Sequence, residues 1–224
     1  MYYIDAYADM YQKLQGFEIC LLDKDNKIEK AYLSFEQSTR STYDIAMRDA
    51  TIDGLITMDD LSKLKLGQIF YKKVNPQELF IIQSINKSEQ QVKSKNINAI
   101  KQNCFITILR NQYNNEKQKN EYKKIYSDII GFVSMQNKDQ KNFAAGVEDN
   151  TVLNIQIPKK NIVGDYLYDV KNLDRIIITD VEKNRNDEVK IESIDAYGVP
   201  GVIRIQGTFD TRTGKSDGTK VRLQ

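Results

Sequence analysis

The sequence predicts an all-β (mainly β) protein: two tandem, similar, small antiparallel β-barrel or β-sandwich domains with a short N-terminal helix. Two observations predict this class. Short runs of alternating apolar and polar residues recur along the chain between polar turns. The chain also resembles itself, because residues 32–57 align with 132–157 and residues 64–110 align with 161–207. A duplicated domain is the simplest explanation of both matches.

The amino-acid composition indicates which classes of protein the chain can belong to. Of the 224 residues, 40% are apolar and 29% are charged, which is typical of a soluble globular chain. The net charge is only +2, with 33 basic and 31 acidic residues interleaved, so sequence-specific reading of DNA is not indicated. No stretch resembles a leader peptide or a membrane span, and we expect synthesis in the cytoplasm without membrane contact.

The pattern of residues 1–17 predicts the N-terminal helix. Apolar residues recur there at helical spacing, and Gly16 is placed to end the helix. Tyrosine is favoured in contact surfaces. Tyr3 and Tyr7 are therefore candidate partner-contact residues, with core packing as the other reading.

Residues 18–112 predict the first β-barrel domain. The stretch IFYKK-VNPQ-ELFIIQSI reads as two strands joined by a tight polar turn, and VKSKNINAI reads as another strand. Gly67 precedes this hairpin at a position where a Cβ would clash. The preceding segment, STRSTYDIAMRDA, is too long for a turn and still alternates. It either folds over its own barrel or docks on a neighbour through Tyr43, Ile45 and Met47.

Residues 113–124 predict a polar linker or a solvated helix, because they have no apolar face to bury. Residues 125–209 predict the second β-barrel domain. LNIQI and VIRIQGTF alternate with period two, EVKIESIDAY is a further strand, and YLYDV-KNLD-RIIITDV repeats the hairpin of the first copy. Each copy then has about six strands.

The second copy contains a counterpart of the long segment, NKDQKNFAAGVED, with Phe143 and Val147 as candidate contacts. Residues 210–224 are rich in Gly and Thr and predict a flexible C-terminal tail that orders against a neighbour, with Val221 as a candidate contact.

The sequence predicts no catalytic residue, no cofactor and no metal. Histidine is absent, which removes the usual base near neutral pH and the commonest metal ligand. TGKS at residues 213–216 lacks the upstream glycine of a phosphate-binding loop, and DKDN at residues 23–26 lacks the glycine and glutamate of a calcium loop. Cys20 and Cys104 each lie in an apolar run and are expected to be reduced, buried thiols. Asp165 and Glu192 are most simply surface charges.

The second copy resembles the head-closure (head–tail connector) proteins of tailed bacteriophages. The resemblance depends on the order GFVSMQN, a long loop, LNIQIP, IVGDYLYDV, RIIITDV and KIESIDAY. Asp165 matches the Gly-Asp that precedes the hairpin in that family, whereas the first copy has Gln68 there. The resemblance covers residues 125–209, and residues 32–110 by way of the repeat.

The resemblance implies a structural virion protein of the neck or collar, and not an enzyme. It implies an oligomeric ring of six or twelve copies between the portal or an adaptor protein and the tail terminator or tube protein, with DNA passing through the lumen. Two alternatives stay open from the residues: a tail baseplate or hub adaptor, and a two-barrel module that binds a ligand or single-stranded nucleic acid. A hydrolase with a carboxylate mechanism is a further, weaker alternative.

Overall fold

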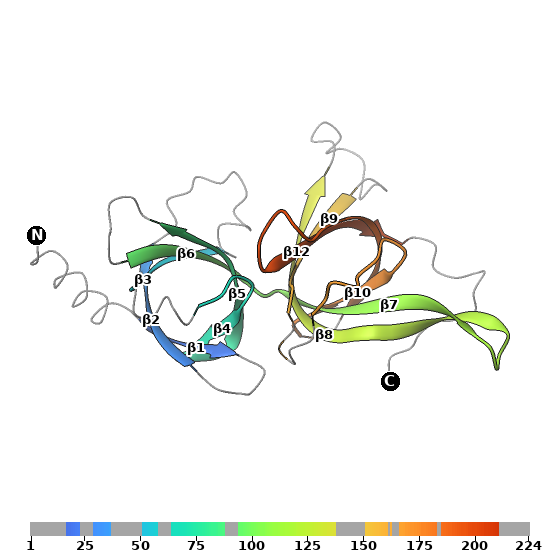
Figure 1. The fold of residues 1–224 in the computed structure, drawn as a ribbon, viewed down its shortest axis with the longest axis horizontal. Coiled ribbons are helices and arrows are strands. Elements are labelled where there is room, and N and C mark those ends of the chain that lie inside the picture. Colours follow the sequence, from blue (N-terminus) through green and yellow to red (C-terminus); the bar gives the residue numbers. More distant parts are fainter. Residues whose placement is uncertain are drawn as a thin grey trace, which may run out of the picture.

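The structure is a computed structural model that describes residues 17–22, 29–36, 51–57, 64–87, 94–137, 151–160, 162, 166–182 and 185–210. The described chain is all-β and forms two closed six-stranded antiparallel barrels, which confirms the predicted fold class. The barrels lie side by side with a long hairpin projecting from the second (Figure 1). The predicted helix, residues 1–17, lies outside the described ranges except for Phe17, which begins a strand.

The first barrel has the strand order β1-β2-β3-β6-β5-β4, closed by pairing of β1 with β4. Its strands are β1 (Phe17–Leu22), β2 (Glu29–Glu36), β3 (Thr51–Thr57), β4 (Ile69–Lys72), β5 (Asn75–Lys87) and β6 (Ser94–Lys101). The predicted hairpin is confirmed, because β4 and β5 pair, but its turn is at residues 73–74 and not at the predicted residues 74–77, of which 75–77 begin β5. Pro76 lies near the start of β5, where the missing N–H costs little.

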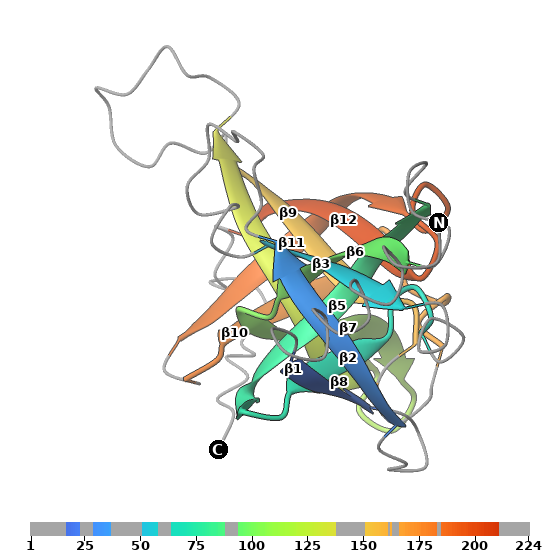
Figure 2. The same ribbon diagram turned by 90° about the vertical axis from the view of Figure 1, so that its left-hand side faces the viewer.

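The second barrel has the same order, because β7-β8-β9-β12-β11-β10 repeats it strand for strand and pairing of β10 with β7 closes it. Its strands are β7 (Cys104–Asn114), β8 (Lys119–Asn137), β9 (Thr151–Pro158), β10 (Arg175–Asp180), β11 (Asn186–Asp195) and β12 (Val202–Phe209). Figure 2 looks from the side of the first barrel, with the second barrel behind it. Gln156 of β9 and Val202 of β12 contact residues of the first barrel.

The barrels also share an irregularity of register. The pairing of β5 with β6 shifts between Ile82 and Ser84, and that of β11 with β12 shifts between Ile191 and Ser193. A β-bulge bends a strand and increases its twist, which helps a small sheet to close. The two bulges stand at corresponding places, which supports a duplicated domain independently of sequence identity.

The alignment that predicts the repeat is correct only in its first part. Residues 32–57 and 132–157 do contain equivalent strands, β2 with β8 and β3 with β9. The alignment of residues 64–110 with 161–207 is wrong, because it equates β7 with β12 and both belong to the second barrel. Ile106 and Ile203, which it treats as counterparts, lie in one core. Buried strands with similar alternation produced the false match.

The predicted domain boundary is also wrong. The sequence places residues 18–112 in the first domain and 113–124 in a linker, but β7 pairs with β8 and β10 of the second barrel. The actual connection is Gln102 and Asn103, between β6 and β7. The Asn103 side chain donates to the Val133 carbonyl (2.7 Å) and accepts from the Val133 N–H (2.8 Å). The Gln102 N–H donates to the Leu79 carbonyl of the first barrel (2.8 Å), so this short connection is hydrogen-bonded to both barrels.

The two barrel interiors and the junction each have an apolar cluster. Ile19, Leu21, Phe70, Phe80 and Ile82 are among the residues that fill the first barrel, and a larger set of Ile, Leu and Val side chains fills the second. A third cluster packs the outer faces against one another; its buried members are Ile69, Ile81, Ile100, Ile130, Phe132 and Val202. Consecutive apolar residues such as Phe80, Ile81 and Ile82 are therefore buried on both faces of one strand.

Candidate functional surfaces: the hairpin arm and the barrel junction

All of the residues predicted as partner contacts lie outside the described ranges, as do the phosphate-loop and calcium-loop candidates and Asp165. These are Tyr3, Tyr7, Tyr43, Ile45, Met47, Phe143, Val147 and Val221. The described Glu192 is exposed on β11, as expected for a surface charge. Cys20 and Cys104 are buried free thiols, as predicted. They lie in different barrels, whereas the predicted domain bounds place both in the first.

Within the described ranges, no group of three or more His, Cys, Asp or Glu residues could hold a metal ion. No helix in those ranges is long and apolar enough to cross a bilayer. The features that do stand out are two surfaces: the projecting hairpin and the groove between the barrels.

The hairpin formed by β7 and β8 extends beyond the barrel, and we call residues 110–124 the arm. The pairing of β7 with β10 ends at Leu109, and the pairing of β8 with β9 begins at Phe132. Among the described strands, those of the arm therefore pair only with each other. The sequence predicts a linker here because the arm has no buried face; Tyr113, for example, is 59% exposed. In Figure 1 the arm points away from both barrels.

Polar contacts order the tip of the arm. Asn114 Nδ2 donates to Glu121 Oε2 (3.0 Å), and Lys117 Nζ pairs with Glu121 Oε1 (3.1 Å). The hydrogen bonds from Asn114 and Lys117 lower the pKa of Glu121 to about 2. The tight turn places Gln118 at a φ of 49°, a conformation that residues other than glycine rarely adopt.

Arg110 holds the base of the arm to the barrel. Its Nε and one terminal nitrogen each donate to a different oxygen of Asp174 at 2.8 Å, and another terminal nitrogen pairs with Asp169 at 2.6 Å. Asp174 is only 2% exposed and also accepts from the Lys171 N–H (2.8 Å). These carboxylates raise the pKa of Arg110 further above its usual range. Such two-pronged pairing fixes the angle at which the arm leaves the barrel.

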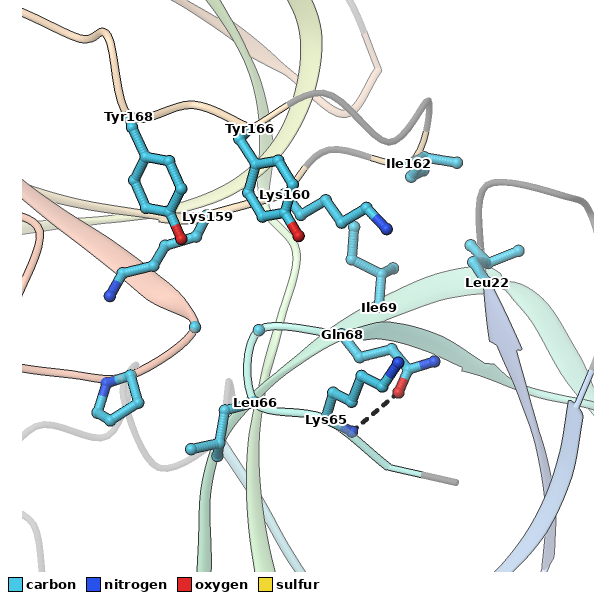
Figure 3. A pocket seen from close by; sticks show the side chains of 13 residues that line it. Leu22, Lys65, Leu66, Gln68, Ile69, Lys159, Lys160, Ile162, Tyr166 and Tyr168 are labelled. Atoms are coloured by element: carbon cyan, nitrogen blue, oxygen red, sulfur yellow. Dashed lines mark hydrogen bonds between the residues drawn. The ribbon is translucent and has the colours of Figure 1, made fainter. Parts of the chain in front are cut away.

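The barrel junction contains a groove of about 320 Å³. One wall is the loop of residues 65–69 in the first barrel, and the other consists of Lys159, Lys160, Tyr166 and Tyr168 in the second. Figure 3 shows the two tyrosine rings side by side, with their hydroxyl ends directed toward the first barrel's wall. Lys65, Lys159 and Lys160 line the groove, and none of its described lining residues is acidic.

The tyrosine wall follows from local alternation. Leu167 is fully buried in the core of the second barrel, so its neighbours Tyr166 and Tyr168 face outward at 58% and 62% exposure. Their rings stack with centroids 5.3 Å apart and planes 8° from parallel. The Leu167 N–H donates to the Lys159 carbonyl (2.8 Å), and Lys160 forms an isolated β-bridge with Tyr166. The segment is thereby tied to the end of β9.

The sequence predicts a strand here, because YLYDV alternates as strands do. The structure contains only the single bridge instead. The reason is that β10, the expected hairpin partner, already pairs with β7 on one edge and β11 on the other. The alternation in this segment wrongly predicts a strand, but it correctly indicates that Tyr166 and Tyr168 face away from the core. The two outward tyrosines could therefore have been identified from the sequence.

No protein-family model matches the chain, and no curated protein matches its sequence.

Proposed function

We propose that the chain is a structural virion protein of the neck of a tailed bacteriophage. It forms a ring that joins the portal and capsid to the tail and lines the DNA channel. The resemblance of the second copy to head-closure proteins supports this role. The activity is then mechanical: the protein acts through shape and docking and not through a reaction.

The observation that carries the proposal is the arm on a rigid pair of barrels. A two-stranded hairpin is marginally stable in water by itself, and the arm pairs with no other described strand of its own chain. Its backbone edges and Tyr113 are available to a neighbour. Closed barrels have no free edges of their own, so the arm is the described place where another chain can add to a sheet.

A contact between the arm of one copy and a different surface of the next is a heterologous contact. Such contacts produce a closed ring when the rotation between copies closes. The hydrogen-bonded connection at Gln102 and Asn103 and the apolar junction keep each copy in one shape. A fixed shape repeats the same rotation from copy to copy, which favours rings of one size such as six or twelve.

The near balance of charge is consistent with a channel wall. Each neutralised phosphate adds salt-dependent attraction between protein and DNA, and a net charge of +2 over 224 residues adds little. DNA can then pass the ring without being held by it over its whole surface.

Shortening the arm tests the proposal. Asn111 lies directly opposite Tyr122, so replacing residues 112–121 by Asn-Gly leaves a regular two-residue hairpin and keeps Arg110 in place. The full-length protein should have the mass of six or twelve subunits by light scattering. The shortened variant should stay monomeric with an unchanged circular dichroism spectrum. The variant Leu173→Ser, at a residue that is 89% exposed, is the matched control and should assemble normally.

Assembly of the shortened variant into the same ring would contradict the role of the arm. The position of the protein in the phage particle needs a separate measurement. Antibodies against the chain should label the junction of head and tail in electron micrographs of particles that contain the protein. Labelling at the far end of the tail would contradict the neck and support the baseplate or hub alternative.

A further inference from the structure

We propose that the groove at the barrel junction binds single-stranded nucleic acid, with lysines on the phosphates and tyrosines against the bases. Four features of the groove indicate this ligand: its charge, its aromatic wall, its apolar lining and its rigidity.

The charge of the groove differs from that of the whole chain. The chain has 33 basic and 31 acidic residues, yet the described lining of the groove contains Lys65, Lys159 and Lys160 and no acidic residue. The lysines come from both walls, so their ammonium groups can approach a ligand from two sides (Figure 3). A concentration of cations of this kind attracts an anion such as a phosphodiester.

The aromatic wall supplies a second, different kind of contact. Tyr166 and Tyr168 present flat rings that are more than half exposed, although aromatic side chains of this size usually bury most of their surface. Exposed rings next to cations are the arrangement with which proteins hold unpaired bases, since every base has a face that can stack. The Lys160 ammonium lies 5.9 Å from the Tyr166 ring centroid, so charge and ring belong to one site.

Leu22, Ile69 and Ile162 add an apolar lining to the groove. Its volume of about 320 Å³ is at the lower end of the roughly 300–1,000 Å³ typical of small-ligand pockets. A nucleotide combines a flat apolar ring with an anionic group, which matches this lining better than a purely anionic ligand does. Bases of a duplex are stacked inside the helix and cannot reach the rings, so the ligand is single-stranded.

The walls of the groove are fixed relative to each other. Gly67 and Gly201 line the groove and stand in backbone contact across the junction. The Gln83 side chain donates to that of Gln156 from one barrel to the other. A preformed site loses little conformational entropy on binding, which favours a measurable affinity even for a few contacts.

Fluorescence anisotropy with a labelled oligothymidylate of about 12 nucleotides, within the site sizes known for small barrels, tests the proposal at low salt. Tyr168→Ala should weaken binding roughly tenfold, as expected for one lost base stack, whereas Tyr168→Phe keeps a ring and should bind within about twofold. The matched control is Tyr113→Ala, at an exposed tyrosine on the arm, and it should bind like the wild type. Circular dichroism verifies that each variant is folded.

Salt dependence identifies the phosphate contacts. The logarithm of affinity should fall with the logarithm of salt concentration at a slope of about −0.7 per phosphate contact. Lys65→Gln and Lys159→Gln should each reduce that slope by about 0.7. A duplex of equal length and thymidine monophosphate should both compete poorly with the oligonucleotide.

Three results would overturn the inference. One is equal affinity for the duplex and the single strand. Another is competition by the mononucleotide at the same concentration as the oligonucleotide, which would indicate a nucleotide pocket instead. The last is no binding of the oligonucleotide by the wild type at low salt, or binding by Tyr168→Ala and by both lysine variants that equals that of the wild type.

Discussion

Gly67 and Gly201 stand in backbone contact across the junction of the two barrels. A Cβ placed on Gly67 would lie 1.8 Å from the carbonyl oxygen of Gly201, and one placed on Gly201 would lie 2.2 Å from the Leu66 carbonyl. Both glycines also have positive φ, 76° and 80°, so two independent constraints exclude a side chain at each. The prediction that a Cβ would clash at Gly67 is therefore confirmed, and the neighbour it meets is the other barrel.

Gly67→Ala should open the junction. The left-handed conformation costs a residue with a Cβ roughly 1–2 kcal/mol, and the clash with Gly201 adds to this because backbone cannot move aside as a side chain can. We expect the wild type to unfold in denaturant in a single transition and Gly67→Ala to unfold in two, one for each barrel. Val74→Ala, at a turn residue that is 81% exposed, is the control; a single unshifted transition in Gly67→Ala would contradict the contact.

Arg110→Ala should destabilise the second barrel strongly. Removing the guanidinium leaves the Asp174 carboxylate buried without its bidentate partner, and breaking a buried pair in this way costs about 3–5 kcal/mol. The exposed pair between Arg185 and Asp187 provides a comparison, because Arg185→Ala should cost below about 1 kcal/mol. Denaturant unfolding of the two variants measures the difference, and equal small losses would contradict the structural role of Arg110.

Asp169 contributes to stability in a pH-dependent way. Its hydrogen bond with Arg110 lowers the pKa of Asp169 from its ordinary value of 3.8. A carboxyl with a lowered pKa in the folded state adds stability above its ordinary pKa and loses it as pH falls through the lowered one. The difference in thermal midpoint between wild type and Asp169→Asn should be present at neutral pH and shrink below about pH 4. A difference independent of pH would contradict this pairing.

Cys104 should give the opposite dependence at alkaline pH. Burial raises the pKa of its thiol from 9.0 to about 12. Below about pH 9 the thiol is protonated in the folded and in the unfolded chain, so its contribution to the free energy of unfolding is complete. Above about pH 9 the thiol ionises in the unfolded chain before it ionises in the folded one, and this stabilises the unfolded state. The unfolding free energy of the wild type relative to Cys104→Ala should therefore fall as pH rises from about 8 to 11. A constant difference would show that the thiol is not desolvated.

Much of the fold could be predicted, because half-buried strands alternate between apolar and polar residues in the sequence. In LNIQI, Leu153, Ile155 and Ile157 are fully buried while the residues between them are not. In VIRIQGTF, Ile203 and Ile205 are buried and Arg204 is exposed, as the alternation predicts. The strand class, the first hairpin and the presence of two similar domains follow from such patterns.

The boundary and the arm could not be predicted in the same way. Residues 110–124 are a ribbon with solvent on both faces, so the alternation that marks a strand is absent from them. The two strands of the arm pair with each other in a register that places, for example, Tyr113 opposite Asn120. The connection at Gln102 could not be recognised from the sequence either. It is buried and hydrogen-bonded like the strands around it, and it lacks the glycine and serine that are typical of a flexible linker.

The groove depends on tertiary arrangement more than on any motif. The outward orientation of Tyr166 and Tyr168 is readable from the burial of Leu167 between them. Their position opposite Lys65 is not readable, because it requires the packing of one barrel on the other through Ile81, Ile100 and their neighbours.

The proposed ring is tested most directly by electron microscopy of the purified full-length protein, with class averages of end-on particles. We expect closed rings with six or twelve subunits around an open centre. Isolated two-barrel particles at every protein concentration, with no rings in the presence of a portal ring, would contradict it.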